Sequence, residues 1–455
     1  MGLLKEMDVV SSDDLASYNT DSLFDVGTGH FSMGVGNEWY LNGGLLPHIN
    51  VFVAPPGNYK STLTNSLARR SHGIYGDSDL IINDSENSLD KDKDRAARMA
   101  EEHMRDEDVL WLKGIDYDLD TFDAFLKEYC QKKEDHEKEL TRTTPFINPN
   151  TGEIIKMMIP TYAYNDSLTE LVCSGEEELI EGEKSKGIGD SKANTVYMLD
   201  GNKKTLFLRT MRRRCQKYNI VYLATGHYDK VIQMDMYSPN PKETLFSKQD
   251  YKVKGCGSKL KFLASIYARC QASILLDSNK EALYADGNTP AKDLHEVDVV
   301  LERCKTANAG EMIPYVCSQA NGLLNSVTNY HYLRLHNYFG LGGNKMKQQP
   351  MLYPDVTVSR NTIREMTNAD PKLRRAIALT AQYCYIQNNW NHAQMHVDFT
   401  QSPEKILDAL LSDKSRDLKS EMLGSRGYWT FKEDADKHPP YMSLIRILEL
   451  CNFVK

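Results

Sequence analysis

Lys60 and Ser61 stand between an apolar run, residues 49–53, and a helix-compatible run, residues 63–70. A lysine followed by serine or threonine, between a strand and a helix, is typical of a loop that binds nucleotide phosphates. The lysine supplies a positive charge for the phosphates, and the serine hydroxyl can ligate Mg²⁺. Backbone N–H groups at the start of the helix favour the same anion. These residues therefore indicate a nucleotide site.

The loop departs from the usual G-x-x-x-x-G-K-[ST] spacing at both glycine positions, which Ala54 and Tyr59 occupy. Gly57 keeps one conformationally permissive position inside the loop. An ordinary turn with an incidental lysine is the alternative, and carboxylates after later strands argue against it. The predicted nucleotide-binding residues are Pro55, Pro56, Gly57, Asn58, Tyr59, Lys60, Ser61 and Thr62.

Two later apolar runs end in carboxylates. Asp166 follows the run 157–164, where a Walker B carboxylate would hold Mg²⁺. Glu86 follows the run 80–82 and can orient the water that attacks a γ-phosphate. Asp84 lies on the same face of that extended segment and competes for this role. Because the carboxyl ends of parallel strands meet at one edge of a sheet, we expect these side chains to converge.

His227 follows the strand-like run 220–224 and is expected at the same edge. Its imidazole can hydrogen-bond a γ-phosphate there and report it to the next loop. A loop histidine without this role is the alternative.

Two stretches concentrate positive charge. Residues 203–217 carry basic side chains and no acidic one, and residues 242–261 carry six lysines against Glu243 and Asp250. Aromatic residues accompany the second stretch, a combination that suits single-stranded nucleic acid through phosphate contacts and base stacking. A solvated charged face is the alternative for both. The predicted DNA-binding residues are Lys248, Lys252, Lys254, Lys259, Lys261, Arg212 and Arg213.

Composition narrows the class of protein. The 455-residue chain has a net charge of −8, so any nucleic-acid site must be a local patch. Nine cysteines without a C-x-x-C pair favour reduced thiols over disulfides or zinc. Neither a secretion signal nor a membrane span is visible, because the longest apolar run, 262–276, is short and contains Arg269. We expect a cytoplasmic protein with no membrane partner, in the host cytoplasm if a phage encodes it.

Strand-like and helix-like runs alternate over most of the chain. This predicts an α/β core with a mostly parallel twisted sheet flanked by helices. The expected domains are an N-terminal arm (1–25), a P-loop core (26–344) and a C-terminal helical extension (345–455).

In this order, the motifs resemble those of the RecA-like recombinases, most closely the phage UvsX type, over roughly residues 26–340. The segments that carry the resemblance are Gly27-Thr28-Gly29, Asn42–Pro47, Tyr59 before the loop lysine, Asn83–Glu86, Asn165–Leu168, His227 and Lys254–Phe262. The resemblance implies a RecA-type P-loop NTPase that hydrolyses ATP in a DNA-dependent reaction, with ATP and Mg²⁺ as cofactors. It also implies that His227 senses the γ-phosphate.

In that family, basic residues of a neighbouring subunit complete each ATP site. Arg303 and Lys305, after the run 296–302, match those positions. The predicted catalytic residues are therefore Glu86, Lys60, His227, Arg303 and Lys305, and the predicted metal ligands are Ser61 and Asp166.

The resulting hypothesis is an ATP-dependent recombinase. Its protomers would form a homo-oligomeric filament on single-stranded DNA, with ATP at subunit interfaces, and pair that strand with homologous duplex DNA. Two alternatives stay open. One is a RecA-fold hexameric replicative helicase that forms closed rings, and the other is a nucleotide-stabilised protein that coats single-stranded DNA with negligible hydrolysis.

Overall fold

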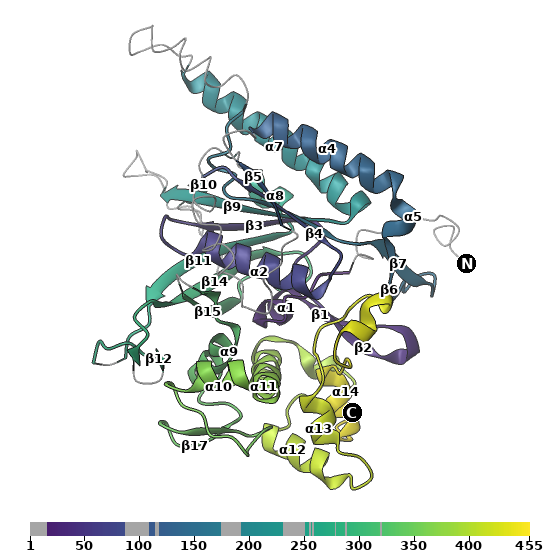
Figure 1. Ribbon diagram of the computed structural model, residues 1–455, viewed down its shortest axis with the longest axis vertical. Helices are drawn as coiled ribbons and strands as arrows, with labels where there is room; N and C mark the ends of the chain where they lie inside the picture. The colour runs from purple at the N-terminus through teal and green to yellow at the C-terminus, as the bar shows by residue number, and fades with distance from the viewer. Residues whose placement is uncertain are drawn as a thin grey trace.

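A ten-stranded sheet flanked by helices forms the centre of the molecule, and a helical C-terminal region lies beyond one end of it (Figure 1). The computed structural model describes residues 16–86, 109–113, 118–173, 193–230, 251–253, 256, 259–277, 279–286, 289–318 and 321–455. The predicted fold class, a mostly parallel α/β sheet with a helical C-terminal region, is confirmed.

The parallel part of the sheet has the spatial order β11, β3, β9, β8, β4, β5. The bounds of these strands are β3 (Ile49–Ala54), β4 (Asp79–Asp84), β5 (Val109–Lys113), β8 (Thr161–Asn165), β9 (Ile220–Lys230) and β11 (Ile266–Ile274). The chain leaves β3 toward β4 on one side, whereas it leaves β11 toward the other side. In open α/β sheets of this kind, ligands bind outside the carboxyl ends of the parallel strands.

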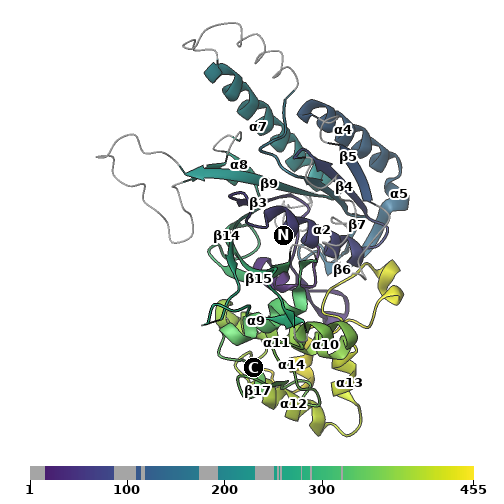
Figure 2. The same cartoon turned by 60° about the vertical axis from the view of Figure 1, so that its left-hand side comes forward.

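β3 is buried on both faces, as a central parallel strand must be. Phe52 and Ala54 pack in one hydrophobic cluster with α2 (Lys60–Ile74). Val51 and Val53 belong to a second cluster with α4 (Leu119–Asp135) and α7 (Ala193–Tyr218), the two long helices that lie together in Figures 1 and 2. Successive side chains therefore enter opposite layers.

An antiparallel ribbon extends the sheet beyond β11. The strands β14 (Leu294–Cys304), β15 (Met312–Ser318) and β16 (Gly322–Leu323) follow in that order. β11 pairs with β3 only over Ile266–Arg269, whereas its pairing with β14 continues to Ile274. The ribbon thus projects past the carboxyl end of β3, beside the loop that follows it.

Smaller elements surround this core. They are α1 (Leu23–Thr28), β1 (His30–Met33), η2 (Val35–Asn37), β2 (Trp39–Asn42), α5 (Glu137–Leu140), β6 (Thr141–Ile147), β7 (Ile154–Met158), β10 (Tyr251–Val253), α8 (Leu260–Leu263), β12 (Ala285–Asp286) and β13 (Thr289–Pro290). The apolar run 157–164, which reads as one buried strand, is divided between two: β7 ends before Pro160 and pairs with β6, while β8 joins the main sheet. Proline cannot donate a hydrogen bond to a ladder, so the strand breaks there.

The C-terminal region is mainly helical. Its elements are α9 (Asn325–Leu335), β17 (Leu341–Gly343), β18 (Gln348–Pro350), α10 (Ile363–Ala369), α11 (Pro371–Asn389), η5 (His392–Gln394), α12 (Pro403–Ser412), α13 (Leu418–Leu423), η6 (Lys432–Lys437) and α14 (Leu444–Leu450). These helices share one hydrophobic cluster with the sheet. The division at residue 344 stays a prediction.

Part of the predicted N-terminal arm packs into this cluster. Tyr18 is fully buried, pairs with Leu45 through both backbone hydrogen bonds, and lies 5.6 Å from Trp429 between ring centroids. Residues 16–20 are buried although several of them are polar, and hydrogen bonds such as Asn19 Nδ2 to the Gly43 carbonyl satisfy part of this polarity.

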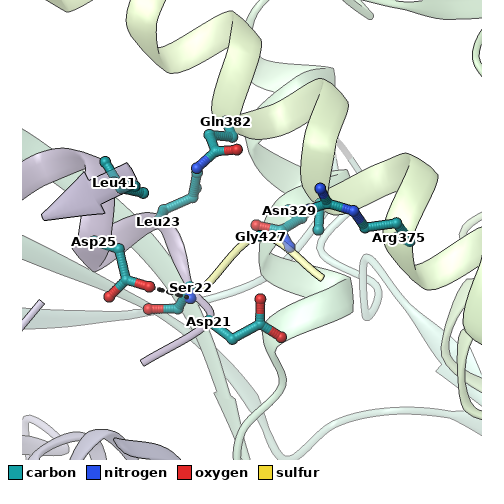
Figure 3. Close-up of a pocket in the computed structure, with 10 residues that line it drawn as sticks. Asp21, Ser22, Leu23, Asp25, Leu41, Asn329, Arg375, Gln382 and Gly427 are labelled. Atoms are coloured by element: carbon teal, nitrogen blue, oxygen red, sulfur yellow. Dashed lines mark hydrogen bonds between the residues drawn. The ribbon is translucent and has the colours of Figure 1, made fainter. Parts of the chain in front are cut away.

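A small pocket of about 30 Å³ lies where this segment meets the C-terminal helices (Figure 3). Asp25 lines it and accepts a hydrogen bond from the Ser22 backbone, and Arg375 of α11 lies across from it. Burial raises the pKa of Asp25 to about 7, against hydrogen bonds from Thr20 that lower it. A Cβ at Gly427 would lie 2.6 Å from Arg375, so this junction is tightly packed.

No helix in the described part of the chain is long and apolar enough to span a lipid bilayer.

Candidate nucleotide site

The loop after β3 connects a central strand to the amino end of a helix, as phosphate-binding loops do. It runs from the end of β3 at Ala54 to the start of α2 at Lys60. Gly57 has φ 77° and Tyr59 has φ 58°, so two loop residues adopt the left-handed conformation. The first turn of α2 follows β3 at the carboxyl edge of the sheet, and its free N–H groups favour an anion there.

Lys60, Glu86 and His227 meet at this edge. Lys60 Nζ lies 3.3 Å from Glu86 Oε1, and His227 Nε2 lies 2.8 Å from the same oxygen. Lys60 is only 6% exposed, so its charge acts in a partly dehydrated environment. Lys60 begins α2, Glu86 lies in the turn after β4, and His227 lies in β9. The sheet brings these three segments together at one edge.

Ser61 and Asp166 form a second group next to the first. The Ser61 hydroxyl donates to Asp166 Oδ1 at 2.9 Å, and Thr225 donates to the same oxygen. The other carboxylate oxygen of Asp166 is buried and receives no hydrogen bond from the described residues. A hydroxyl and a spare carboxylate oxygen fit Mg²⁺, which takes few protein ligands and keeps waters and phosphate oxygens as the others.

The two carboxylates have opposite electrostatic surroundings. Burial raises the pKa of Glu86, but the His227 hydrogen bond and the Lys60 charge outweigh it and hold the pKa at about 2. Burial dominates at Asp166 and raises its pKa, despite the opposing charge of Lys60. Glu86 is therefore ionised at neutral pH. A carboxylate with such a low pKa orients and polarises a water better than it removes its proton.

Backbone contacts fix Glu86 beside Asp166. The Glu86 N–H donates to the Asp166 carbonyl at 3.0 Å, and the Ser85 hydroxyl donates to the Ser167 carbonyl at 2.7 Å. Asp84, the competing candidate, is the buried last residue of β4. These contacts place Glu86 beside Lys60, His227 and Asp166.

Lys305 lies at the opposite, amino edge of the sheet, whereas Arg303 lies level with Val51, midway along β3. Arg303 pairs with Tyr267, and the Lys305 N–H donates to Ser265, whose own N–H donates to Ile49 at the start of β3. The length of β3, roughly 17 Å for five residue steps, separates this edge from Lys60. The Arg303 guanidinium donates to the Lys261 carbonyl at 2.9 Å.

The predicted DNA-binding lysines have different surroundings. Lys248 and Lys254 lie outside the described residues, whereas Lys252 and Lys259 are exposed. Lys261 instead pairs with the buried carboxylate of Glu302 at 2.7 Å. Lys261 is therefore held in an ion pair in this structure, and its role in DNA binding stays a prediction.

The same carboxylate, Glu302, also binds Arg269 at 2.9 Å and accepts a hydrogen bond from Tyr251 at 2.6 Å. These contacts fix both flanks of residues 254–258 to β14.

Arg212 and Arg213 are exposed on α7. They line a groove of about 630 Å³ together with Arg209 of the same helix and Leu263 of α8. Three arginines along one groove suit a phosphate backbone.

Sequence reasoning missed three residues of this region. Thr225 precedes His227 by two positions, and strand alternation gives a signal that both face the crevice. His295, which contacts Tyr59, and Ala272, which contacts Asn58, left no local signal because they are distant in sequence.

No family model matches the chain, and no curated protein does. Among solved structures, the chain is similar to one described as an ATPase domain, with 11% identity and a TM-score of 0.36. The match covers 62% of this chain and 86% of that one. Because this likeness is weak, the functional argument rests on the geometry of the site.

Proposed function

We propose that the protein is a RecA-like ATPase that forms filaments on single-stranded DNA and acts as a recombinase. The observation that carries this proposal is the convergence of Lys60, Ser61, Glu86, Asp166 and His227 at the carboxyl edge of one parallel sheet. A cation, a hydroxyl–carboxylate pair and an ionised carboxylate within one crevice are the parts that phosphoryl transfer to water requires.

In this proposal the loop N–H groups and Lys60 bind the phosphates. Ser61 and Asp166 would hold Mg²⁺, which neutralises charge on the phosphate oxygens. Lys60 now contacts Glu86, so a bound phosphate would draw Lys60 away and leave Glu86 free to orient the attacking water. His227 would hydrogen-bond the γ-phosphate, and β9 would transmit this contact to the residues that follow the strand.

The basic surfaces support the DNA part of the proposal. Lys252, Lys259, Arg212 and Arg213 are exposed in a chain whose net charge is −8, so positive charge is concentrated locally. The position of Lys305 at the amino edge of the sheet supports head-to-tail assembly, in which one subunit's amino edge meets the next subunit's crevice.

The experiment measures ATP hydrolysis with and without single-stranded DNA, together with electron microscopy in the presence of an ATP analogue. We expect stimulation by DNA and helical filaments. Lys60→Ala should lose nucleotide binding and hydrolysis, because its charge is the main cation at the phosphates. Closed hexameric rings would favour the helicase. DNA coating without turnover would favour the coating protein.

A further inference from the structure

Tyr59 adopts the left-handed conformation, with φ 58° and ψ 16°, at the start of α2. The usual phosphate-loop spacing has glycine at this position, and glycine adopts that conformation without strain. A bulky residue there is strained unless its surroundings hold it. A contact outside the loop is therefore needed to keep the loop in shape.

His295 makes such a contact. The Tyr59 hydroxyl and His295 Nδ1 lie 2.8 Å apart, within hydrogen-bond distance, and the two ring centroids are 4.9 Å apart. The preceding loop residue is held by the same ribbon, because the Ala272 N–H donates to Asn58 Oδ1 at 2.8 Å. Two consecutive loop residues are thus tied to β11 and β14.

The extended ribbon explains why these partners are within reach. His295 pairs with Ile274, in the part of β11 and β14 that continues past the pairing with β3. Ala272 lies in the same part. The two paired strands of the ribbon therefore lie along the side of the phosphate loop. Their pairing fixes the backbone that carries the His295 imidazole.

We propose that His295 is a positioning residue for the phosphate loop. It holds Tyr59 in the left-handed conformation and thereby aims the loop N–H groups at the nucleotide phosphates. His295 acts through Tyr59 and does not touch the nucleotide. This inference rests on the proposed nucleotide site, and it accounts for a phosphate loop that lacks its second glycine.

The test compares His295→Ala in two backgrounds, the native chain and Tyr59→Gly. Affinity is measured by titration with fluorescent ADP. If only about a tenth of the loops keep the binding shape without the His295 contact, His295→Ala weakens binding about tenfold in the native background. In the Tyr59→Gly background the loop needs no such contact, so the same substitution should change affinity less than about twofold.

Conservative substitution separates positioning from general packing. Asn at position 295 can present a polar atom close to the place of Nδ1, so His295→Asn should retain most of the affinity. Tyr59→Phe removes the hydroxyl alone and should reproduce much of the loss seen in His295→Ala. Tyr338, which also has φ 58° but lies just beyond α9, provides the matched control. In a Tyr338→Gly background, His295→Ala should still cost about tenfold.

Amide hydrogen exchange of residues 57–62, measured without nucleotide, gives a second readout. His295→Ala should accelerate exchange in the native background and leave it unchanged in Tyr59→Gly. Equal losses of affinity in both backgrounds, or unchanged exchange in His295→Ala, would overturn the proposal. A native protein that binds no nucleotide would refute the proposed function, whereas the exchange comparison would still decide whether His295 holds the loop.

Discussion

The two edges of the central sheet carry charged residues that are used in different ways. At the carboxyl edge, Lys60 and His227 both contact Glu86, so the Lys60 charge is paired within one subunit. At the amino edge, Arg212 and Arg213 are exposed on α7. The first edge therefore holds most of a candidate nucleotide site within one subunit. The second edge instead exposes positive charge that a partner outside the subunit could bind.

The largest effect should come from the carboxyl edge. Glu86→Gln should slow ATP hydrolysis about a hundredfold or more, roughly 3 kcal/mol of barrier, because the neutral amide cannot polarise the attacking water. Nucleotide affinity should stay near that of the native protein, and single-turnover hydrolysis measures the difference. Asp84→Asn is the matched control, and a larger loss there than in Glu86→Gln would transfer the role to Asp84.

The second effect tests whether the amino edge completes a neighbour's site. Arg303→Ala with Lys305→Ala should leave nucleotide binding intact and lower hydrolysis about tenfold or more, since charge on the transferring phosphoryl group would lose its cationic partners. Mixed with Lys60→Ala protein, the double variant should regain activity at interfaces that combine an intact loop with intact basic residues. Co-assembly without any regained activity, at every mixing ratio, would contradict a shared site.

The smallest effect separates the exposed lysines from the paired one. Lys252→Ala with Lys259→Ala should reduce the slope of log affinity for single-stranded DNA against log salt by about 1.4, if each lysine neutralises one phosphate. Lys261→Ala should leave this slope unchanged and lower the free energy of unfolding by about 1 kcal/mol, because Glu302 loses one of its two cations. A slope that responds to Lys261 alone would show that this ion pair opens on binding DNA.

Local patterns sufficed to predict the parallel sheet and to indicate the residues of the carboxyl edge. The signals for Lys60, Asp166 and Glu86 lie within a few residues of strand ends, and parallel strands align those ends. Long-range contacts gave no such signal. The Lys261–Glu302 pair spans 41 residues and the Tyr59–His295 contact spans 236, so both depend on strand pairing that composition does not reveal.

Burial of the N-terminal segment, residues 16–20, was likewise not predictable from its residue types. Polar residues such as Ser17 and Asn19 predict an exposed arm. The segment is buried instead, with the Asn19 side chain donating to the Gly43 carbonyl and the Ser17 backbone N–H donating to the Asn42 side chain.

One strand joins both regions of this comparison. β14 carries His295 against the phosphate loop and, seven residues later, Glu302 against Tyr251 and Lys261. If nucleotide and single-stranded DNA each favour one arrangement of this strand, their affinities are thermodynamically linked. The factor by which DNA tightens nucleotide binding must then equal the factor by which nucleotide tightens DNA binding. Two equilibrium titrations measure these factors, one of nucleotide with and without DNA and one of DNA with and without nucleotide. The two factors can be compared without knowing the hydrolysis rate.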